Sequence, residues 1–458
     1  MEHSLGAISS GLFYLSCSLI IIISAFKRLK FSYLLIFFEY FYILGFGIFP
    51  VLVGFGIVGL PNSALSYETV NGSILPLTYF HVISYSMGML VGWGSFRNLA
   101  NQIGVRVAGV GSHNVINNSV CFYSISIFSV IMGLIYFSLT GFQSAIINAS
   151  AIRGGDFSSF SGYEQYQFLK TVSQIGMIGI IFVPYFIINK SNSASRVFLI
   201  LTLIAGINYL LTAARVVFFD TVGFFMILIL IYKRFNLGTA FLGTGILIIL
   251  LAAVFFGKVA GAVIGLYLGG QELYFGTLPD NISNFFFGHF SHLIYSVDAG
   301  IRNFQSFGPL ISIDILLSPL GFIPTFVFTS VGLDWLNYKI VSPDMQLCCI
   351  NSEYFNTESP CSIPPYFVGV SAYIFPVIGG FIFGLIKFFF YSVIEQALLQ
   401  LKSKPEFLWF PLLLVIIGNK LILFIPATIS FAVFLIVILY CILAIKIFLK
   451  SLLQSRRS

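Results

Sequence analysis

Arg215 is the residue whose position the sequence restricts most closely. It lies in an apolar segment, 197–232, flanked by Arg196 and Lys233. Two crossings of a bilayer core about 30 Å thick, at about 1.5 Å per residue, use nearly all of that length. The turn between the crossings therefore falls near Arg215, at or just beneath the outer surface. Its fork of N–H donors suits a phosphate or diphosphate, although an arginine that only marks the membrane interface is the alternative.

The same reasoning makes other basic residues candidates for binding phosphate. Arg153 stands before two glycines, in Arg153-Gly-Gly-Asp156, where the backbone could approach a ligand closely. Arg302 could hold the same kind of group. Weaker phosphate candidates are Lys258, Lys339 and Lys420.

Two histidines are candidates for proton transfer, in His289-Phe-Ser-His292, shortly before Asp298-Ala-Gly-Ile-Arg302. If His292 begins a helical register, His289 lies one turn before it and Arg302 about three turns after it. Histidine is well suited to removing a proton from a sugar hydroxyl near neutral pH. The alternative is that both are ordinary interfacial residues. No third ligand stands at metal-binding spacing, so we predict no metal site.

The composition indicates which class of fold holds these residues in place. Hydrophobic residues make up 58% of 458 positions, charged residues make up 9%, and the mean hydropathy is +0.99. A soluble chain of this length would need far more polar surface. The apolar runs are helix-length and lack the alternation of a barrel strand, so we predict an all-α polytopic membrane protein. The net charge of +7 comes from basic residues scattered at the ends of apolar runs, which does not favour nucleic acid.

The apolar runs predict about eleven transmembrane helices. Sixteen basic residues, Lys387 among them, then fall inside and seven fall outside, with the N-terminus outside and the C-terminus inside. The first run precedes Lys27 and Arg28 and is expected to be an uncleaved span. Glu39 and His81 lie within spans, where each should bond the other or a neighbouring helix. The predicted spans are 5–26, 31–53, 73–96, 119–141, 169–189, 197–213, 216–232, 237–257, 366–391, 407–425 and 427–449.

Three regions follow from this layout. Residues 1–257 form a bundle of eight spans with an outer loop at 142–168, and residues 366–458 form a bundle of three spans. Between them, residues 258–365 form a large outer loop before the ninth span. Its apolar stretch 307–333, broken by prolines, is expected to be a half-inserted or interfacial element.

Cysteines of this loop lie close together. They are Cys348, Cys349 and Cys361. Outside the cytoplasm a bridge from Cys361 to Cys348 or Cys349 is plausible, and the connectivity stays open.

Several of these segments together resemble a known family. They are the hairpin Leu210-Leu-Thr-Ala-Ala-Arg215, the outer-loop Arg153, and the stretch from Arg302 through Ile323-Pro324 to Pro364-Pro365-Tyr-Phe-Val-Gly369. This layout is similar to that of the Wzy-type oligosaccharide repeat-unit polymerases of bacterial O-antigen and capsule synthesis. The chain departs from the pattern at Ala214, where a serine often precedes the arginine, and at Val370, where an acidic residue is often found.

The resemblance implies a GT-C-like glycosyltransferase of the bacterial inner membrane with a periplasmic active face. It would transfer a glycan from undecaprenyl diphosphate onto a new lipid-linked repeat unit, without metal or other cofactor. Arg153, Arg215 and Arg302 would hold diphosphates, and His289 or His292 would act as base, with Asp298 or Glu272 next. Such enzymes work beside a flippase and a chain-length regulator.

Two other functions remain open on the sequence. An O-antigen ligase shares the outer loop and the basic residues. A lipid-linked oligosaccharide flippase or other transporter should show inverted repeats and polar residues at the midplane, and the sequence contains no internal repeat.

Overall fold

The helical prediction is confirmed for the part of the chain that the structure describes. In this computed structural model every regular element among those residues is a helix, and none is a strand. The described residues are 2–26, 39, 42–111, 119–142, 144–145, 167–173, 176, 179, 181–183, 186, 191–212, 282–310, 329–333, 347, 349–356, 366–401, 404 and 408–420. The helices are α1 (Glu2–Phe26), the π-helical turn η1 (Ile43–Ile48), α3 (Phe49–Gly54), α4 (Asn62–Asn71), α5 (Pro76–Gly94), α6 (Arg97–Gly111), α7 (Ser119–Thr140), α9 (Gln167–Ser173), α11 (Ser191–Thr212), α15 (Ile282–Phe307), α19 (Tyr366–Ile374), α20 (Ile378–Leu401) and α21 (Trp409–Lys420).

Among the described residues, three helices are long and apolar enough to cross a membrane, two of them at the predicted spans 5–26 and 119–141 and one overlapping 366–391. They are Leu5–Ser24, Phe122–Thr140 and Ile378–Leu401. Large apolar side chains on their surfaces are exposed, such as Leu12 at 47% and Leu134 at 56%, as expected where lipid covers a helix. Shorter apolar helices, Ile43–Gly54 and Arg196–Asn208, fall at two further predicted spans. The eleven-span layout as a whole extends beyond the described residues.

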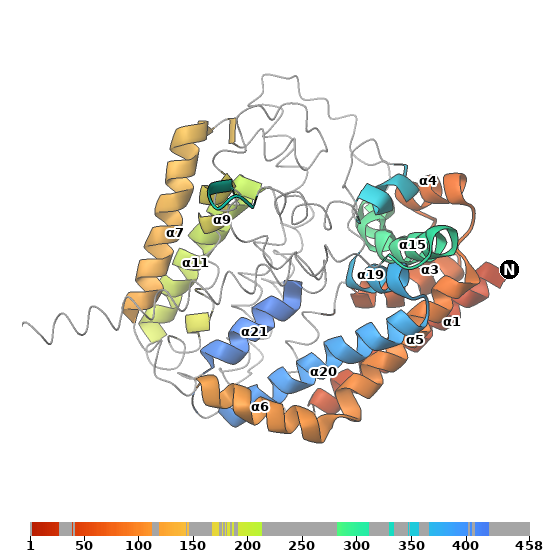
Figure 1. Ribbon diagram of the computed structural model, residues 1–458, viewed down its shortest axis with the longest axis horizontal. Coiled ribbons are helices and arrows are strands. Elements are labelled where there is room, and N and C mark those ends of the chain that lie inside the picture. Colours follow the sequence, from red (N-terminus) through yellow and green to blue (C-terminus); the bar gives the residue numbers. More distant parts are fainter. Residues whose placement is uncertain are drawn as a thin grey trace, which may run out of the picture.

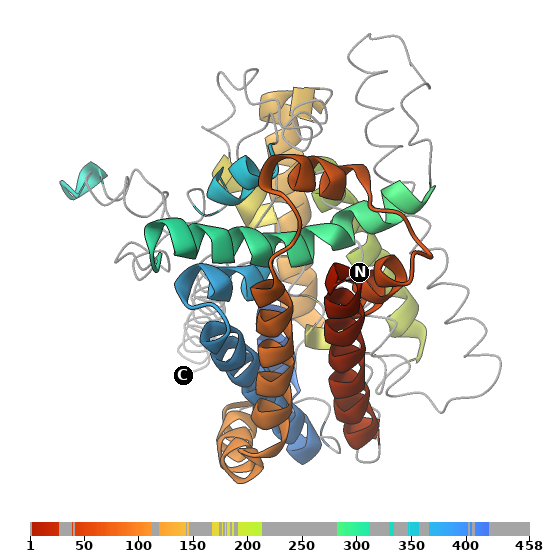
Figure 2. The same cartoon turned by 90° about the vertical axis from the view of Figure 1, so that its right-hand side faces the viewer.

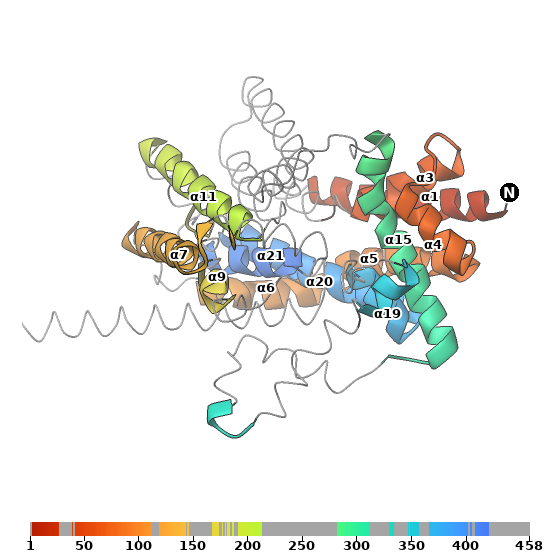
Figure 3. The ribbon, with the colours of Figure 1, turned by 90° about the horizontal axis from the view of Figure 1, so that it is seen from above.

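The helices form two groups (Figures 1 and 3). On one side α7, α9 and α11 pack together, and on the other α1, α4, α5, α15 and α19 lie close to one another. The helices α20, α6 and α21 run between the groups. The helices that carry the candidate site, α4, α5 and α15, belong to the second group.

Helices α1, α5 and α20 lie side by side and run in the same direction. Gly6 of α1 approaches Tyr79 near the start of α5, while Ser24 at the other end of α1 accepts a 2.9 Å hydrogen bond from Trp93 Nε1. Gly88 of α5 and Gly384 of α20 each lie against the backbone of the other helix, where a β-carbon would overlap a carbonyl oxygen. Small residues permit this close helix packing in membranes.

Helix α15 lies across the ends of these parallel helices (Figure 2). It lies at the end of the molecule where α1 and α5 begin, together with α4, while α6 lies at the opposite end. Residues 293–301 of α15 are buried on every side. It packs against α4, η1 and α19, with Gly300 approaching the carbonyl of Gly369.

The prediction of one continuous ninth span at 366–391 was wrong. The structure has two helices there, α19 and α20, separated at Phe375-Pro376-Val377, and α20 continues to Leu401. His81 holds this break: its Nδ1 accepts the N–H of Val377 at 2.9 Å, and its Nε2 lies 2.9 Å from Ser371 Oγ. Val377 has φ +66°, a left-handed conformation that a β-branched residue rarely adopts without such support.

Lys387, which the charge pattern counted among the inner basic residues, does not face water. It is completely buried within α20, and its Nζ lies 2.5 Å from Oε1 of Glu39. The Tyr42 ring covers the same ammonium, with its centroid 4.1 Å away. A buried charge needs such partners, and Glu39 thus pairs with a neighbouring helix, which was one of the two expectations.

Candidate functional site

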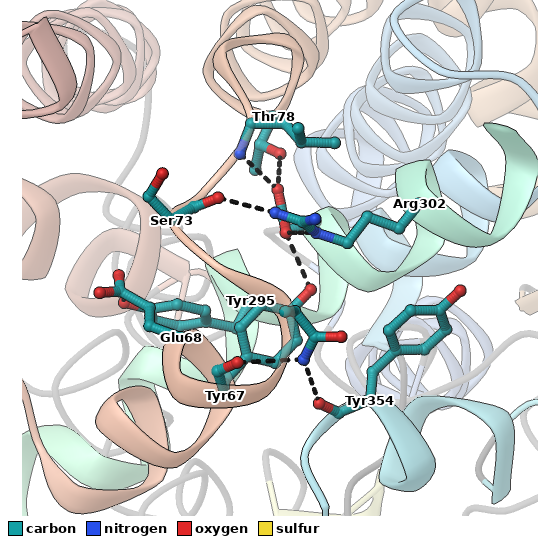
Figure 4. Close-up of polar contacts among 10 residues, drawn as sticks. Tyr67, Glu68, Ser73, Thr78, Tyr295, Arg302 and Tyr354 are labelled. Carbon is teal, nitrogen blue, oxygen red and sulfur yellow. Dashed lines mark hydrogen bonds and ion pairs between the residues drawn. The ribbon is translucent and has the colours of Figure 1, made fainter. Parts of the chain in front are cut away.

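A continuous stripe of polar and aromatic side chains runs along α15. His292, Tyr295, Asp298 and Arg302 fall within about 120° of the helix circumference at about 100° per residue. This stripe faces α4, the connection between α4 and α5, and the segment 349–356 (Figure 4). Residues from distant parts of the chain meet here, at the end of the bundle where α15 lies.

Asp298 is the centre of the hydrogen-bond network. Its carboxylate is completely buried and accepts four hydrogen bonds, two on each oxygen. Oδ1 accepts from the Leu75 N–H at 2.8 Å and from Thr78 Oγ1 at 2.7 Å. Oδ2 accepts from Tyr67 OH at 2.8 Å and from Arg302 Nε at 2.6 Å. A carboxylate so engaged holds its neighbours in position, and it would have to give up these bonds to act as a base.

Arg302 is oriented from two sides but stays partly accessible. Besides the bond to Asp298, its Nη2 donates to the carbonyl of Ser73 at 2.7 Å, and 21% of its side chain is exposed. Figure 4 shows the guanidinium reaching toward Ser73 in the connection between α4 and α5. Within the described part of the chain these bonds use two of the five N–H groups of the guanidinium, so others can donate to an acceptor from outside.

Glu68 gives the site a second carboxylate. It lies on α4, is partly exposed, and accepts a 2.7 Å hydrogen bond on Oε1 from Tyr295 OH. The rings of Tyr67 and Tyr295 lie against each other with centroids 4.9 Å apart, and Phe355 packs on both. Figure 4 shows Glu68 and Arg302 on either side of the two tyrosines.

The segment 349–356 closes one side of the site. Asn71 Nδ2 of α4 donates to the carbonyl of Tyr354 at 2.6 Å, and Asn351 Nδ2 donates to Ser296 Oγ of α15 at 3.0 Å. The ring of His292 packs edge-on against Phe355 with centroids 5.2 Å apart. These contacts hold the segment against both helices.

Cys349 begins this segment and is disulfide-bonded. A bridge of Cys349 was one of the two pairings that the sequence left open, and Cys348 and Cys361 lie outside the described residues. Cys17 in α1 is a buried free thiol.

Burial and charge shift the pKa values of the groups around Asp298. Burial, followed by the charge of Asp298, raises the pKa of Tyr67 far above its ordinary value, so its hydroxyl stays protonated and donates. Burial, followed by the hydrogen bond to Glu68, does the same for the pKa of Tyr295. Burial alone would lower the pKa of Arg302, but the hydrogen bond and charge of Asp298 outweigh it and raise the pKa.

The structure brings together only some of the predicted site residues. His289, His292, Asp298 and Arg302 all lie on α15, as the helical register predicted. Lys420 ends α21. The other candidates lie outside the described residues: Arg153, Arg215, Lys258, Lys339 and Glu272.

Sequence reasoning missed the contribution of α4. Tyr67, Glu68, Ser73 and Thr78 stand near a short polar connection that carries no motif. Glu68 is the single carboxylate between the predicted spans 31–53 and 73–96, and this was the one signal that could have drawn attention to it.

No protein-family model, no curated protein and no solved structure matches this chain. The resemblance to repeat-unit polymerases therefore rests on the sequence layout, and the functional assignment rests on the chemistry of the site.

Proposed function

We propose that this chain is a polymerase of undecaprenyl-diphosphate-linked oligosaccharide repeat units, building O-antigen or capsular polysaccharide at the periplasmic face of a bacterial inner membrane. It transfers the growing glycan from its lipid diphosphate to the non-reducing end of a new lipid-linked unit. The diphosphate is the leaving group, so the reaction needs stabilised negative charge and an activated acceptor hydroxyl.

The observation that carries the proposal is Arg302. Its guanidinium is fixed by Asp298 and Ser73 before any ligand arrives, yet part of it is exposed and keeps N–H donors available. A positioned arginine of this kind binds diphosphate with little reorganisation and neutralises the charge that develops on it.

The location of Arg302 supports the same function. Helix α15 lies across the ends of apolar helices, as an element at a membrane surface would (Figure 2). The diphosphate of a lipid-linked sugar lies at that level, between the buried prenyl chain and the glycan in water. Flippase and chain-length regulator are the partners that this function implies.

The decisive experiment removes the gene from the bacterium that carries it and separates the lipopolysaccharide on a gel. Loss of a polymerase leaves lipid A core with one repeat unit. Loss of a ligase removes every attached unit, and loss of a flippase removes repeat units from the surface. Either of the last two patterns would replace the proposal with the corresponding function.

Complementation of that deletion with variants tests the site. Arg302→Ala should give the one-unit pattern, and immunoblotting of the membrane fraction separates this loss of function from a loss of protein, because the substitution also removes the partner of the buried Asp298. Arg106→Ala is the matched control, since Arg106 is an exposed arginine of α6 at the opposite end of the molecule, and it should restore the full ladder.

A further inference from the structure

We propose that Glu68 is the general base that activates the acceptor hydroxyl, a role for which the sequence singled out other residues. The inference rests on the proposed polymerase function and assigns the proton-accepting group of the same site. Three observations carry it: the open oxygen of Glu68, its orientation by Tyr295, and its placement relative to Arg302.

The first observation concerns which carboxylates can reach a substrate. Asp298 is completely buried with four donors on its two oxygens. Glu68 uses one oxygen, Oε1, for Tyr295 and is partly exposed. Within the described ranges, no hydrogen bond or ion pair reaches its Oε2. That oxygen is available to a sugar hydroxyl.

The second observation is that Glu68 is held in position. Tyr295 is buried to 1% exposure and donates its hydroxyl to Glu68 at 2.7 Å. Phe355 and Tyr67 pack against the Tyr295 ring, so the phenol has little freedom to move. A base whose position is fixed by a buried partner is preorganised for proton transfer. Glu353, by contrast, is an exposed carboxylate of the segment 349–356 and no such partner holds it in the described part of the chain.

The third observation is the spacing along α15. Tyr295, which orients Glu68, and Arg302 are seven residues apart, or about 10 Å along the helix axis. The reaction places a base about 3 Å from the acceptor oxygen, that oxygen about 3 Å from the anomeric carbon, and the guanidinium about 3 Å from the departing diphosphate. Tyr295, which holds Glu68, and Arg302 therefore lie on the same face of one helix, so that the base and the cation can act on one bound substrate.

The proton and electron balance is complete with these groups. The acceptor hydroxyl gives its proton to Glu68 Oε2 while its oxygen forms a bond to the anomeric carbon of the donor glycan. The bond from that carbon to the diphosphate oxygen breaks, and the diphosphate leaves with the electron pair. Arg302 stabilises the added negative charge, and Glu68 later releases its proton to water.

Purified full-length chain tests the proposal with lipid-linked repeat units extracted from the deletion strain. Glu68→Gln keeps an oxygen that accepts from Tyr295 but takes up no proton. We expect its turnover to fall by about 10²–10⁴-fold while binding of radiolabelled lipid-linked unit changes less than about threefold. The matched control Glu353→Gln should keep wild-type turnover within about twofold.

A second variant separates chemistry from structure. Glu68→Ala leaves space for a small carboxylate, so added formate should restore part of its turnover in a concentration-dependent way. Wild-type turnover in Glu68→Gln would overturn the assignment to Glu68. The assignment to Glu68 would also be overturned if Glu68→Gln lost binding and turnover equally and formate did not rescue the turnover of Glu68→Ala. Absence of elongation by the wild-type chain would instead overturn the polymerase proposal itself.

Discussion

The guanidinium of Arg302 donates from Nε to Oδ2 of Asp298, one helical turn earlier on α15, at 2.6 Å. The carboxylate is completely buried, whereas the guanidinium is partly exposed. The buried carboxylate thus anchors the guanidinium, and the other side of the guanidinium stays partly exposed. The same carboxylate also joins α15 to α4 and to the start of α5, through Tyr67 and Thr78. One ion pair therefore supports both the fold and the candidate site.

Asp298→Asn should lower the stability of the protein as well as its function. The substitution removes the charge that Arg302, Tyr67 and Thr78 share, and it leaves donors facing an amide. Breaking a pair with one buried partner costs about 3 kcal/mol. Thermal unfolding in detergent measures the change, and exposed Glu353→Gln serves as the control, with an expected effect within about 0.5 kcal/mol. An unchanged unfolding temperature for Asp298→Asn would contradict the central position given to this carboxylate.

Tyr67→Phe should alter how stability depends on alkaline pH. Burial and the charge of Asp298 raise the pKa of Tyr67 in the folded protein, whereas a tyrosine in the unfolded chain has a pKa of about 10. The folded state holds the proton more tightly, so this contribution is intact below about pH 10 and is lost as the pH rises further. Above the pKa of the unfolded chain, each such tyrosine lowers the free energy of unfolding by about 1.4 kcal/mol per pH unit.

The variant lacks this titrating group, so its stability should fall less steeply than that of the wild type between about pH 10 and pH 12. At neutral pH it should be less stable by about 2 kcal/mol, because a hydrogen bond to a charged group is lost. Unfolding temperatures measured from neutral pH to about pH 12 give both the difference in stability at neutral pH and the difference in slope at alkaline pH. Parallel curves for the two proteins would show that Tyr67 ionises as easily in the fold as in the unfolded chain.

Local patterns in the sequence predicted local structure. The apolar runs at 5–26 and 119–141 became α1 and α7, whereas the helical register considered for His289 to Arg302 was only conditional and the extent of α15 within the outer loop was not predicted. Membrane-spanning segments are readable in this way because their length and polarity follow from bilayer thickness.

Contacts between distant segments were not predictable in the same way. Tyr67 and Asp298 are 231 residues apart, and nothing in the periodicity of either segment identifies the other. The burial of Lys387 was missed for a related reason, since a count of basic residues treats each one as facing water. The partner that allows it to be buried, Glu39, lies far away in the sequence. Single-sequence patterns indicate where a helix forms but not which distant segments it contacts.

The α5–α20 contact predicts that two alanine substitutions in α5 have different effects on the stability of the protein. At Gly88 a β-carbon would overlap the backbone of Phe381 and Leu385, so Gly88→Ala should destabilise the protein by about 1–3 kcal/mol. At Gly94 nothing in the described structure lies within 4 Å of that position. Gly94→Ala should be neutral or stabilising by up to about 1 kcal/mol, because alanine favours a helix. Thermal unfolding of both variants in the same detergent compares them, and equal effects would contradict the close packing.

The buried pair of Glu39 and Lys387 predicts that substitutions of the two residues have strongly coupled effects on stability. Lys387 is enclosed by Glu39 and the Tyr42 ring, so Glu39→Gln leaves a buried ammonium without its counter-charge. We expect either single substitution, Glu39→Gln or Lys387→Met, to cost about 3–5 kcal/mol.

The double variant should recover most of that loss, because two neutral side chains of similar size need no charge partner. The coupling energy follows from unfolding free energies of the wild type, both single variants and the double variant. Additive losses in the double variant would mean that the two groups act separately. In that case the close approach of Nζ and Oε1 would not be what holds α20 against residue 39.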